Sequence, residues 1–208
     1  MPVSSDPALL RLDDALRRVA ELTRGRTASG RSHMAADDII GTIATDDAIG
    51  FDPRPLLRAM RRCRAPVVVI GQVAGIMHGS GELTGDLDLL WDGAEAHAGA
   101  MAAAFGSAGA QLADDQGLPL ACDAAAFRLP KLVFSTPAAS GDCCTPALPW
   151  GDLPITEFIA RREVASAAGL EISYLRREDL IRMRRVAGRP KDLRRAAELE
   201  RLPGPTPR

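Results

Sequence analysis

Apolar residues near the start of the chain recur at intervals of three and four, as they do along one face of an α-helix. This spacing predicts a helix over residues 7–23. A polar stretch rich in glycine and serine follows over residues 23–32 and is typical of a linker. Helical spacing then returns and predicts two further helices, over residues 36–45 and 53–63. The first quarter of the chain is therefore expected to be mainly helical.

The middle of the chain has the pattern of alternating strands and helices. An unbroken β-branched run at residues 66–71 predicts a strand that is buried on both faces. A short helix of small residues is expected over residues 72–78, and a second strand over residues 83–91. In that second strand, the period-two alternation places Asp86 and Asp88 on the same face.

The remaining elements are expected in the second half of the chain. They are a helix over residues 94–110, strands over 118–123 and 127–135, a turn leading into a short strand over 136–144, a helix over 154–168, a strand over 170–174, a helix over 177–188, and a last helix that begins near Pro190. This succession predicts an α/β (α+β) fold with a small mixed sheet.

Charge is distributed unevenly along the chain, although the formal net charge of the 208 residues is only −1. Residues 1–64 carry a net charge of +2. Residues 65–160 hold 11 acidic and 2 basic side chains, whereas residues 161–208 hold 7 acidic and 13 basic ones. A carboxylate-rich centre needs an external cation or open solvent, and a basic last third suits a polyanion such as a nucleotide or RNA. Simple solvation is the alternative interpretation for any single arginine.

Composition argues against several other classes of protein. Aromatic residues make up only 4% of the chain, which disfavours a protein that works by stacking bases on aromatic platforms. No apolar run approaches the ~20 residues that a membrane span requires, so no membrane association is expected. The four cysteines lack metal-ligand spacing, and Cys143 and Cys144 are adjacent. Thiols in a reducing compartment are therefore expected, which predicts a cytoplasmic protein.

The chemistry is expected at Asp86 and Asp88, whose carboxylates would lie close enough together to chelate one or two hard cations. A buried, unneutralised pair of carboxylates is costly, so a metal ion or solvent must accompany it. Gly71 and Gln72 stand at the preceding strand-to-helix turn, where backbone amides and the helix dipole favour phosphate. Metal ligands on one side and phosphate-binding amides on the other are typical of phosphoryl or nucleotidyl transfer.

Two segments resemble one family of enzymes. The segment VIGQVAGIMHGSGELTGDLDLL resembles the first motif of the DNA polymerase β-like nucleotidyltransferases, and above all that of the AbiEii/MenT-type toxins. The matching positions are Gly71, Ala74, His78, Gly79, Thr84, Asp86 and Asp88. The later segment EDLIRMRRVAGRPKDL resembles a second element of these toxins. Its matching positions are Leu180, Ile181, Met183, Gly188, Arg189, Pro190, Lys191 and Asp192. The resemblance covers about residues 52–200.

The resemblance implies a nucleotidyltransferase toxin of a toxin–antitoxin system. Such an enzyme would transfer a nucleotide from an NTP to the 3′ end of tRNA, with two Mg²⁺ ions, and thereby block translation. The resemblance also implies inhibition by a cognate antitoxin or by phosphorylation. In this interpretation residues 1–50 are a helical N-terminal extension, residues 51–150 the catalytic core, and residues 151–208 a basic, mainly helical region that would hold the tRNA phosphates.

The predicted catalytic and metal-binding residues are Asp86, Asp88 and a third carboxylate from a later strand. Asp142 is the first choice for the third carboxylate, with Asp123 as the alternative; Asp142 would otherwise be an ordinary turn residue. The predicted nucleotide-binding residues are Gly71, Gln72, Thr84, Arg184, Lys191 and Asp192. Thr84 would orient Asp86, touch phosphate or be an ordinary strand residue.

The chain departs from the pattern of these toxins at three positions. Gln72 replaces a small residue at the phosphate turn, Glu82 and Leu83 stand where an arginine precedes the threonine, and Arg184 replaces a lysine. An arginine still binds a triphosphate, but it does not act as a base. Two alternatives therefore stay open: the same chemistry on a small molecule or a protein, as in antibiotic adenylylation or AMPylation, and a degenerate fold that only binds a partner.

Overall fold

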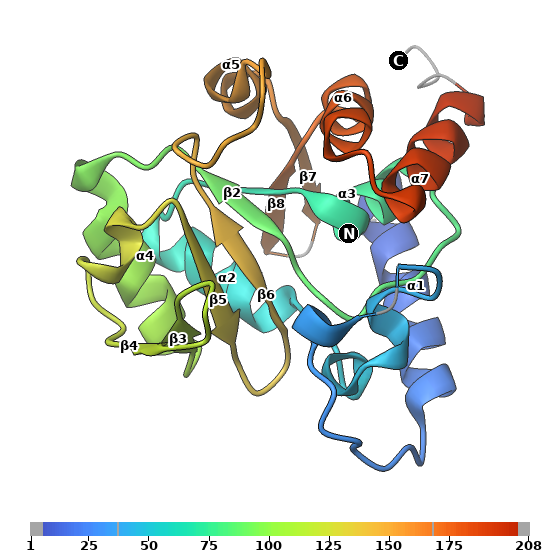
Figure 1. Ribbon diagram of the computed structural model, residues 1–208, viewed down its shortest axis with the longest axis horizontal. Helices are drawn as coiled ribbons and strands as arrows, with labels where there is room; N and C mark the ends of the chain where they lie inside the picture. Colours follow the sequence, from blue (N-terminus) through green and yellow to red (C-terminus); the bar gives the residue numbers. More distant parts are fainter. Residues whose placement is uncertain (1–5, 37, 168, 204–208) are drawn as a thin grey trace.

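The computed structural model describes residues 6–36, 38–167 and 169–203. They form one mixed sheet with helices packed around it (Figure 1). The strands are β1 (Val67–Val69), β2 (Leu89–Trp91), β3 (Gln111–Ala113), β4 (Pro119–Leu120), β5 (Lys131–Ser135), β6 (Ser140–Cys144), β7 (Glu163–Ala167) and β8 (Leu170–Tyr174). The α-helices are α1 (Pro7–Thr23), α2 (Arg54–Cys63), α3 (Gly71–His78), α4 (Glu95–Ser107), α5 (Ile155–Ala160), α6 (Arg177–Ala187) and α7 (Pro190–Arg201). The 3₁₀ helices are η1 (His33–Ala35), η2 (Thr42–Ala44), η3 (Asp46–Ala48) and η4 (Ala126–Arg128).

The sheet has the strand order β4-β3-β5-β6-β2-β1-β8-β7. Strand β1 pairs antiparallel with β2 and parallel with β8, and β2 pairs parallel with β6. The predicted α+β class with a mixed sheet is therefore confirmed. Strands β7 and β8 come from the C-terminal region, yet they extend the same sheet as the strands of the central region.

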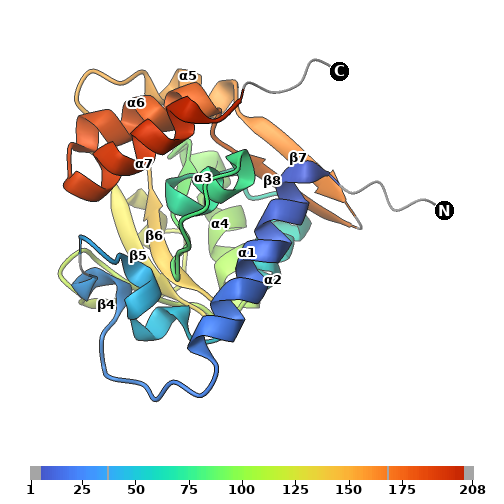
Figure 2. The same ribbon diagram turned by 90° about the vertical axis from the view of Figure 1, so that its right-hand side faces the viewer.

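Helices pack on both sides of this sheet. Helix α2 contacts α4 and β8 and lies behind the central strands in the view of Figure 1. At the other side, α1 packs against α3, and α3 contacts the helix pair α6–α7 (Figure 2). No helix within the three described ranges combines the length and the apolar character that crossing a membrane requires.

Helix α1 begins and ends where its sequence predicts. Asp6 Oδ1 accepts a hydrogen bond from Ala8 N at 2.9 Å, and Pro7 occupies the first turn, where its missing N–H removes no helical bond. The apolar stripe, which includes Leu12 and Val19, is buried against the core. The helices predicted farther along the chain correspond to α2, α3, α4, α6 and α7, with ends that shift by a few residues.

The prediction of a helix over residues 36–45 is wrong. The described part of this stretch contains only the short η2, and Asp37 lies outside the described residues. Gly41 has a φ of +74°, a left-handed conformation that interrupts a right-handed helix. The hydroxyl of Thr42 is bound to Thr84, which belongs to a distant part of the chain. Tertiary hydrogen bonds therefore override the local helical pattern.

Several further predictions fail in part. The strands predicted over residues 118–123 and 127–135 are limited to β4 and β5, with η4 between them, and β3 is not among the predicted elements. The strand predicted over residues 83–91 is confined to β2, since Gly85 donates its amide to Thr42 Oγ1 at 3.0 Å instead of to a neighbouring strand. The helix predicted over residues 154–168 ends at Ala160, and the following residues form β7, which pairs antiparallel with β8. Residue 168 lies outside the described part.

Gly141 on β6 allows the backbone leading into β2 to approach very closely. A Cβ atom at this position would lie 1.9 Å from the carbonyl oxygen of Leu87. Leu87 N donates to Ser140 O at 2.9 Å, so the close approach is held by a hydrogen bond. This contact sets the distance between the residues around Asp88 and those around Asp142.

Replacement of Gly141 by alanine is therefore expected to lower the free energy of unfolding by about 2–4 kcal/mol, because backbone atoms cannot move aside as a flexible side chain does. For a chain of this size the melting temperature should fall by roughly 5–15 °C. Gly99→Ala is the matched control: nothing lies within 4 Å of its added Cβ, and helix propensity should raise the melting temperature slightly. Equal melting temperatures of Gly141→Ala and the wild type would show that the backbones at Gly141 and Leu87 do not lie this close together.

Candidate functional site

One pocket is lined by both carboxylates and basic side chains, and we call it the carboxylate pocket. Its lining includes Asp86, Asp88, Asp142, Lys131, Arg189, Lys191, Arg195, His33, Asp38 and Thr42. It lies between the central strands β2 and β6, helix α7, and residues 33–48, which we call the N-terminal segment. Four residues from the predicted site are therefore brought together here: Asp86, Asp88, Asp142 and Lys191.

Strand pairing explains why the three carboxylates meet. Leu89 of β2 is in register with Cys143 of the parallel strand β6. One residue earlier in each chain segment, the same register places Asp88 beside Asp142. Asp86 is two residues before Asp88, and the intervening Leu87 is fully buried, so the predicted alternation between the two faces is confirmed.

The carboxylate of Asp86 is held by two threonine hydroxyls. Thr42 Oγ1 donates to Asp86 Oδ1 at 2.8 Å, and Thr84 Oγ1 donates to the same oxygen. The two hydroxyl oxygens are themselves 2.8 Å apart. Of the roles considered for Thr84, orienting Asp86 is the one that the geometry supports.

Asp88 is the most electrostatically strained of the three carboxylates. Burial raises the pKa of Asp88 to about 8, and the negative charges of Asp86 and Asp142 add to the effect. Gly71, with a φ of +62°, makes room for it: a Cβ there would lie 1.9 Å from Asp88 Oδ2. The glycine at the start of α3 is therefore required by the carboxylate next to it.

Asp142 is neutralised by two basic neighbours. Lys131 Nζ lies 2.9 Å from one of its oxygens, and His33 Nε2 lies 3.8 Å from the other. Burial works against the charged form, but these partners lower the pKa of Asp142 nonetheless. Burial would also lower the pKa of His33, yet Asp142 and Asp47 raise it to about 10, so the imidazole is cationic at neutral pH.

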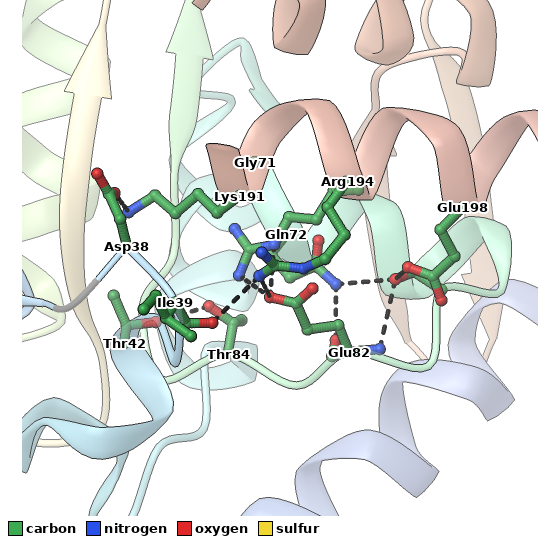
Figure 3. Close-up of polar contacts among 12 residues, drawn as sticks. Asp38, Ile39, Thr42, Gly71, Gln72, Glu82, Thr84, Lys191, Arg194 and Glu198 are labelled. Atoms are coloured by element: carbon green, nitrogen blue, oxygen red, sulfur yellow. Dashed lines mark hydrogen bonds and ion pairs between the residues drawn. The ribbon is translucent and has the colours of Figure 1, made fainter. Parts of the chain in front are cut away.

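Helix α7 supplies the basic wall of the pocket. Lys191 Nζ forms an ion pair with Asp38 Oδ1 at 3.1 Å, and in Figure 3 its side chain points from α7 toward that residue. Arg189 Nε is 2.5 Å from Asp192 Oδ2, so Asp192, which is buried, orients this arginine and does not itself line the pocket. Arg195 is paired with Glu82 at 2.7 Å.

Arg184 and Gln72 form a buried network behind the start of α3 and do not line the pocket. Arg184 Nη2 donates to Gln72 Oε1 at 2.7 Å and to Gly71 O at 3.1 Å, and its Nη1 donates to Arg195 O at 3.1 Å. Burial lowers the pKa of Arg184 to about 10, and the charge of Arg195 adds to the effect. Gln72 Nε2 continues the network to Ser80 Oγ at 2.9 Å. Both side chains thus brace the Gly71 turn.

The other candidates have structural surroundings. His78 Nε2 is 2.7 Å from Leu175 O and its ring packs beside Tyr174. Asp123 is exposed and accepts hydrogen bonds from two backbone amides that follow it. The cysteines Cys143 and Cys144 are buried free thiols.

Sequence reasoning missed His33, Thr42, Lys131 and Arg189 as pocket residues. The N-terminal segment that carries His33 and Thr42 lies outside the region of resemblance, and its local pattern predicted a helix. Lys131 had a signal that could have revealed it, because the chain contains only two lysines, Lys131 and Lys191. Both of them line the carboxylate pocket.

A divalent cation is compatible with part of this pocket. Among the described residues, no group of three or more His, Cys, Asp or Glu side chains meets in a metal-binding arrangement as it stands. Asp86 and Asp88 nevertheless face the pocket as a pair, and the strained Asp88 would gain most from a cation. Asp142 already faces Lys131 and His33, so it would become a ligand only by giving up one of them.

Comparison of the chain with known protein families, with curated proteins and with solved structures finds no match. The fold and the site themselves define an α+β protein with a mixed-charge pocket beside the central strands of its sheet.

The raised pKa of Asp88 predicts a pH-dependent gain in stability for Asp88→Asn in metal-free buffer. In the folded wild type the carboxyl keeps its proton up to about pH 8, whereas in the unfolded chain it loses the proton near pH 4. Wild-type stability therefore falls relative to the asparagine variant as pH rises from about 4 to about 8, by up to ~1.4 kcal/mol per unit.

Melting temperatures of both proteins at pH 4.5 and pH 8, with a chelator present, measure this difference. The exposed Asp115→Asn variant serves as the control and should show no such widening gap. A gap between Asp88→Asn and the wild type that stays constant with pH would contradict the assigned environment of Asp88.

Proposed function

We propose that the chain is a Mg²⁺-dependent nucleotidyltransferase whose substrate is an NTP and whose acceptor is RNA. The observation that carries the proposal is the carboxylate pocket, where Asp86 and Asp88 oppose the basic side chains of Lys191 and Arg189. A triphosphate bound to a divalent cation needs both signs of charge at once, carboxylates for the cation and basic groups for the phosphates. The two resembling segments supply the opposite walls of this pocket.

In this proposal Asp86 and Asp88 hold Mg²⁺, which would neutralise charge on the phosphates during transfer. Lys191 and Arg189 bind the phosphate oxygens, and Lys191 would exchange its exposed partner Asp38 for them. The hydroxyl oxygen of the acceptor attacks the α-phosphorus of the NTP and loses its proton to solvent water. The bond from the α-phosphorus to the oxygen that bridges to the β-phosphate breaks, and pyrophosphate leaves with that oxygen. Arg184 does not contact the substrate in this proposal. Its hydrogen bond to Gly71 O fixes the turn that lies beside Asp88.

The lowered pKa of Asp142 makes it a weak base, which disfavours it as the acceptor of the proton that the attacking hydroxyl loses. Its ion pair with Lys131 instead keeps a lysine inside the pocket, next to the carboxylates. We assign Asp142 to holding Lys131 and His33 in place, with coordination of a second cation as the role it would gain by releasing one of them.

The acceptor is proposed to be the 3′ end of tRNA, as the resemblance to the toxins implies. The support is electrostatic: residues 161–208 carry a net charge of +6, and several of the arginines on α6 and α7 are exposed. Not every arginine is available, however, since Arg195 is buried in its pair with Glu82 and Arg177 donates to the carbonyls of Leu202 and Pro203. A toxin paired with an antitoxin is the biological role that this activity implies.

Asp86→Ala and Asp88→Ala are each expected to lower nucleotide transfer at least 1,000-fold (roughly 4 kcal/mol of transition-state stabilisation) while the fold persists. The assay supplies each labelled NTP, Mg²⁺ and total RNA and measures label in RNA. Asp123→Ala, an exposed carboxylate far from the pocket lining, is the control and should keep full activity. Transfer by both pocket variants at the wild-type rate, or no transfer by the wild type to any RNA, would contradict the proposal.

Salt dependence distinguishes an RNA acceptor from a small one. Binding of many RNA phosphates releases counterions, so incorporation at limiting RNA should fall by orders of magnitude between roughly 50 and 200 mM salt. Arg176→Glu with Arg185→Glu, both exposed at α6, should weaken RNA binding and leave NTP binding unchanged. The equal charge change on α2, Arg58→Glu with Arg62→Glu, is the control. If nucleotide incorporation changes neither with salt nor in the α6 double variant, a small-molecule or protein acceptor is favoured.

A further inference from the structure

The N-terminal segment reaches the carboxylate that the proposed chemistry depends on. Thr42, at the start of η2, is buried and lies 2.8 Å from Thr84, although the two are separated by 42 positions in the sequence. Figure 3 shows the two threonines side by side, next to Lys191 and Asp38. Thr42 therefore belongs to the pocket, while the region of resemblance begins only after it.

The hydrogen bonds of Thr42 direct its proton to Asp86. Gly85 N donates to Thr42 Oγ1 at 3.0 Å and so occupies the acceptor side of the hydroxyl. The hydroxyl proton is then available for Asp86 Oδ1 or for Thr84 Oγ1, each 2.8 Å away, and Thr84 Oγ1 in turn donates to the same Asp86 oxygen. Both hydroxyls thus bind the same oxygen. Among the described residues no donor is recorded for the other oxygen, Oδ2, so Oδ1 anchors the carboxylate and Oδ2 is left for a ligand.

The segment is fastened on both sides of Thr42. Asp38 pairs with Lys191 at 3.1 Å, and Arg194 donates to Ile39 O at 3.1 Å. On the other side, Thr45 Oγ1 donates to Thr42 O at 2.7 Å. These contacts hold the backbone of Thr42 in place, and the contacts of its hydroxyl with Gly85, Thr84 and Asp86 hold the side chain in one rotamer.

We propose that Thr42 is a positioning residue, which orients the Asp86 carboxylate so that its second oxygen binds the divalent cation. The inference rests on the proposed function in one respect, the binding of a cation by Asp86. Hydrogen-bond partners of metal-binding carboxylates commonly change metal affinity 10- to 100-fold when removed. The N-terminal segment is accordingly a working part of the site and not an appendage.

The test measures Mn²⁺ affinity by electron paramagnetic resonance of the free ion, together with the melting temperature, and needs no RNA or NTP. Thr42→Val removes the hydroxyl at nearly constant volume and should weaken Mn²⁺ binding about 10-fold or more. Thr42→Ser keeps the hydroxyl and should restore affinity to within about 3-fold of the wild type. Should the valine variant fail to fold, Thr42→Ala removes the same hydroxyl.

Thr23→Val is the matched control, because it removes another buried hydroxyl, which donates to Val19 O within α1, without touching a carboxylate or the N-terminal segment. It should lower the melting temperature and leave Mn²⁺ affinity unchanged. Equal losses of affinity in Thr42→Val and Thr23→Val, or wild-type affinity in Thr42→Val, would overturn the positioning role. If the wild type binds no Mn²⁺, or binds it no more tightly than Asp86→Ala does, the proposed function is overturned and the inference with it.

Discussion

The arrangement of the carboxylate pocket depends on one constraint, the crowding of three carboxylates beside the central strands β2 and β6. The parallel register of β2 and β6 brings Asp88 next to Asp142, and the alternation of side chains adds Asp86 on the same face. Burial, together with the repulsion from Asp86 and Asp142, raises the pKa of Asp88 to about 8. A fold that keeps such a cluster without compensation would lose stability, so charge and hydrogen bonding must be supplied from elsewhere.

Compensation comes from the N-terminal segment and from the central region, and it differs for each carboxylate. Asp142 has two cations beside it, Lys131 and His33, whereas Asp86 has neutral hydroxyls, those of Thr42 and Thr84. Asp88 lies in the space made by a glycine, where the charges of His33 and Arg195 offset only part of the rise in its pKa. This asymmetry suits a site in which Asp86 is oriented, Asp142 is already neutralised, and the charged form of Asp88 would be stabilised by a bound cation. Helix α7 brings basic side chains to the same opening, so a cation and its phosphate anion would find complementary charges together.

The sequence predicts those parts of this arrangement that depend on a local pattern of apolar and polar residues. Period-two alternation located Asp86 and Asp88, and helical spacing located most of the helices. It failed over residues 36–45, where hydrogen bonds to distant residues replace a helix, and it gave Arg184 a place at the phosphates that buried bonds to Gly71 and Gln72 do not support. Thr42 and His33 act through tertiary contacts, and no spacing in the sequence encodes those contacts.

The most direct test of the central claim is a crystal structure with Mn²⁺ and a non-hydrolysable NTP, using the anomalous signal of manganese. An anomalous peak is expected within ~2.0–2.3 Å of oxygens of both Asp86 and Asp88, the range for a small divalent cation on carboxylates. The phosphates are expected on the side of Lys191. A nucleotide that binds outside the carboxylate pocket, or a pocket with no anomalous peak at saturating Mn²⁺, would contradict the claim that these carboxylates form a cation site for nucleotidyl transfer.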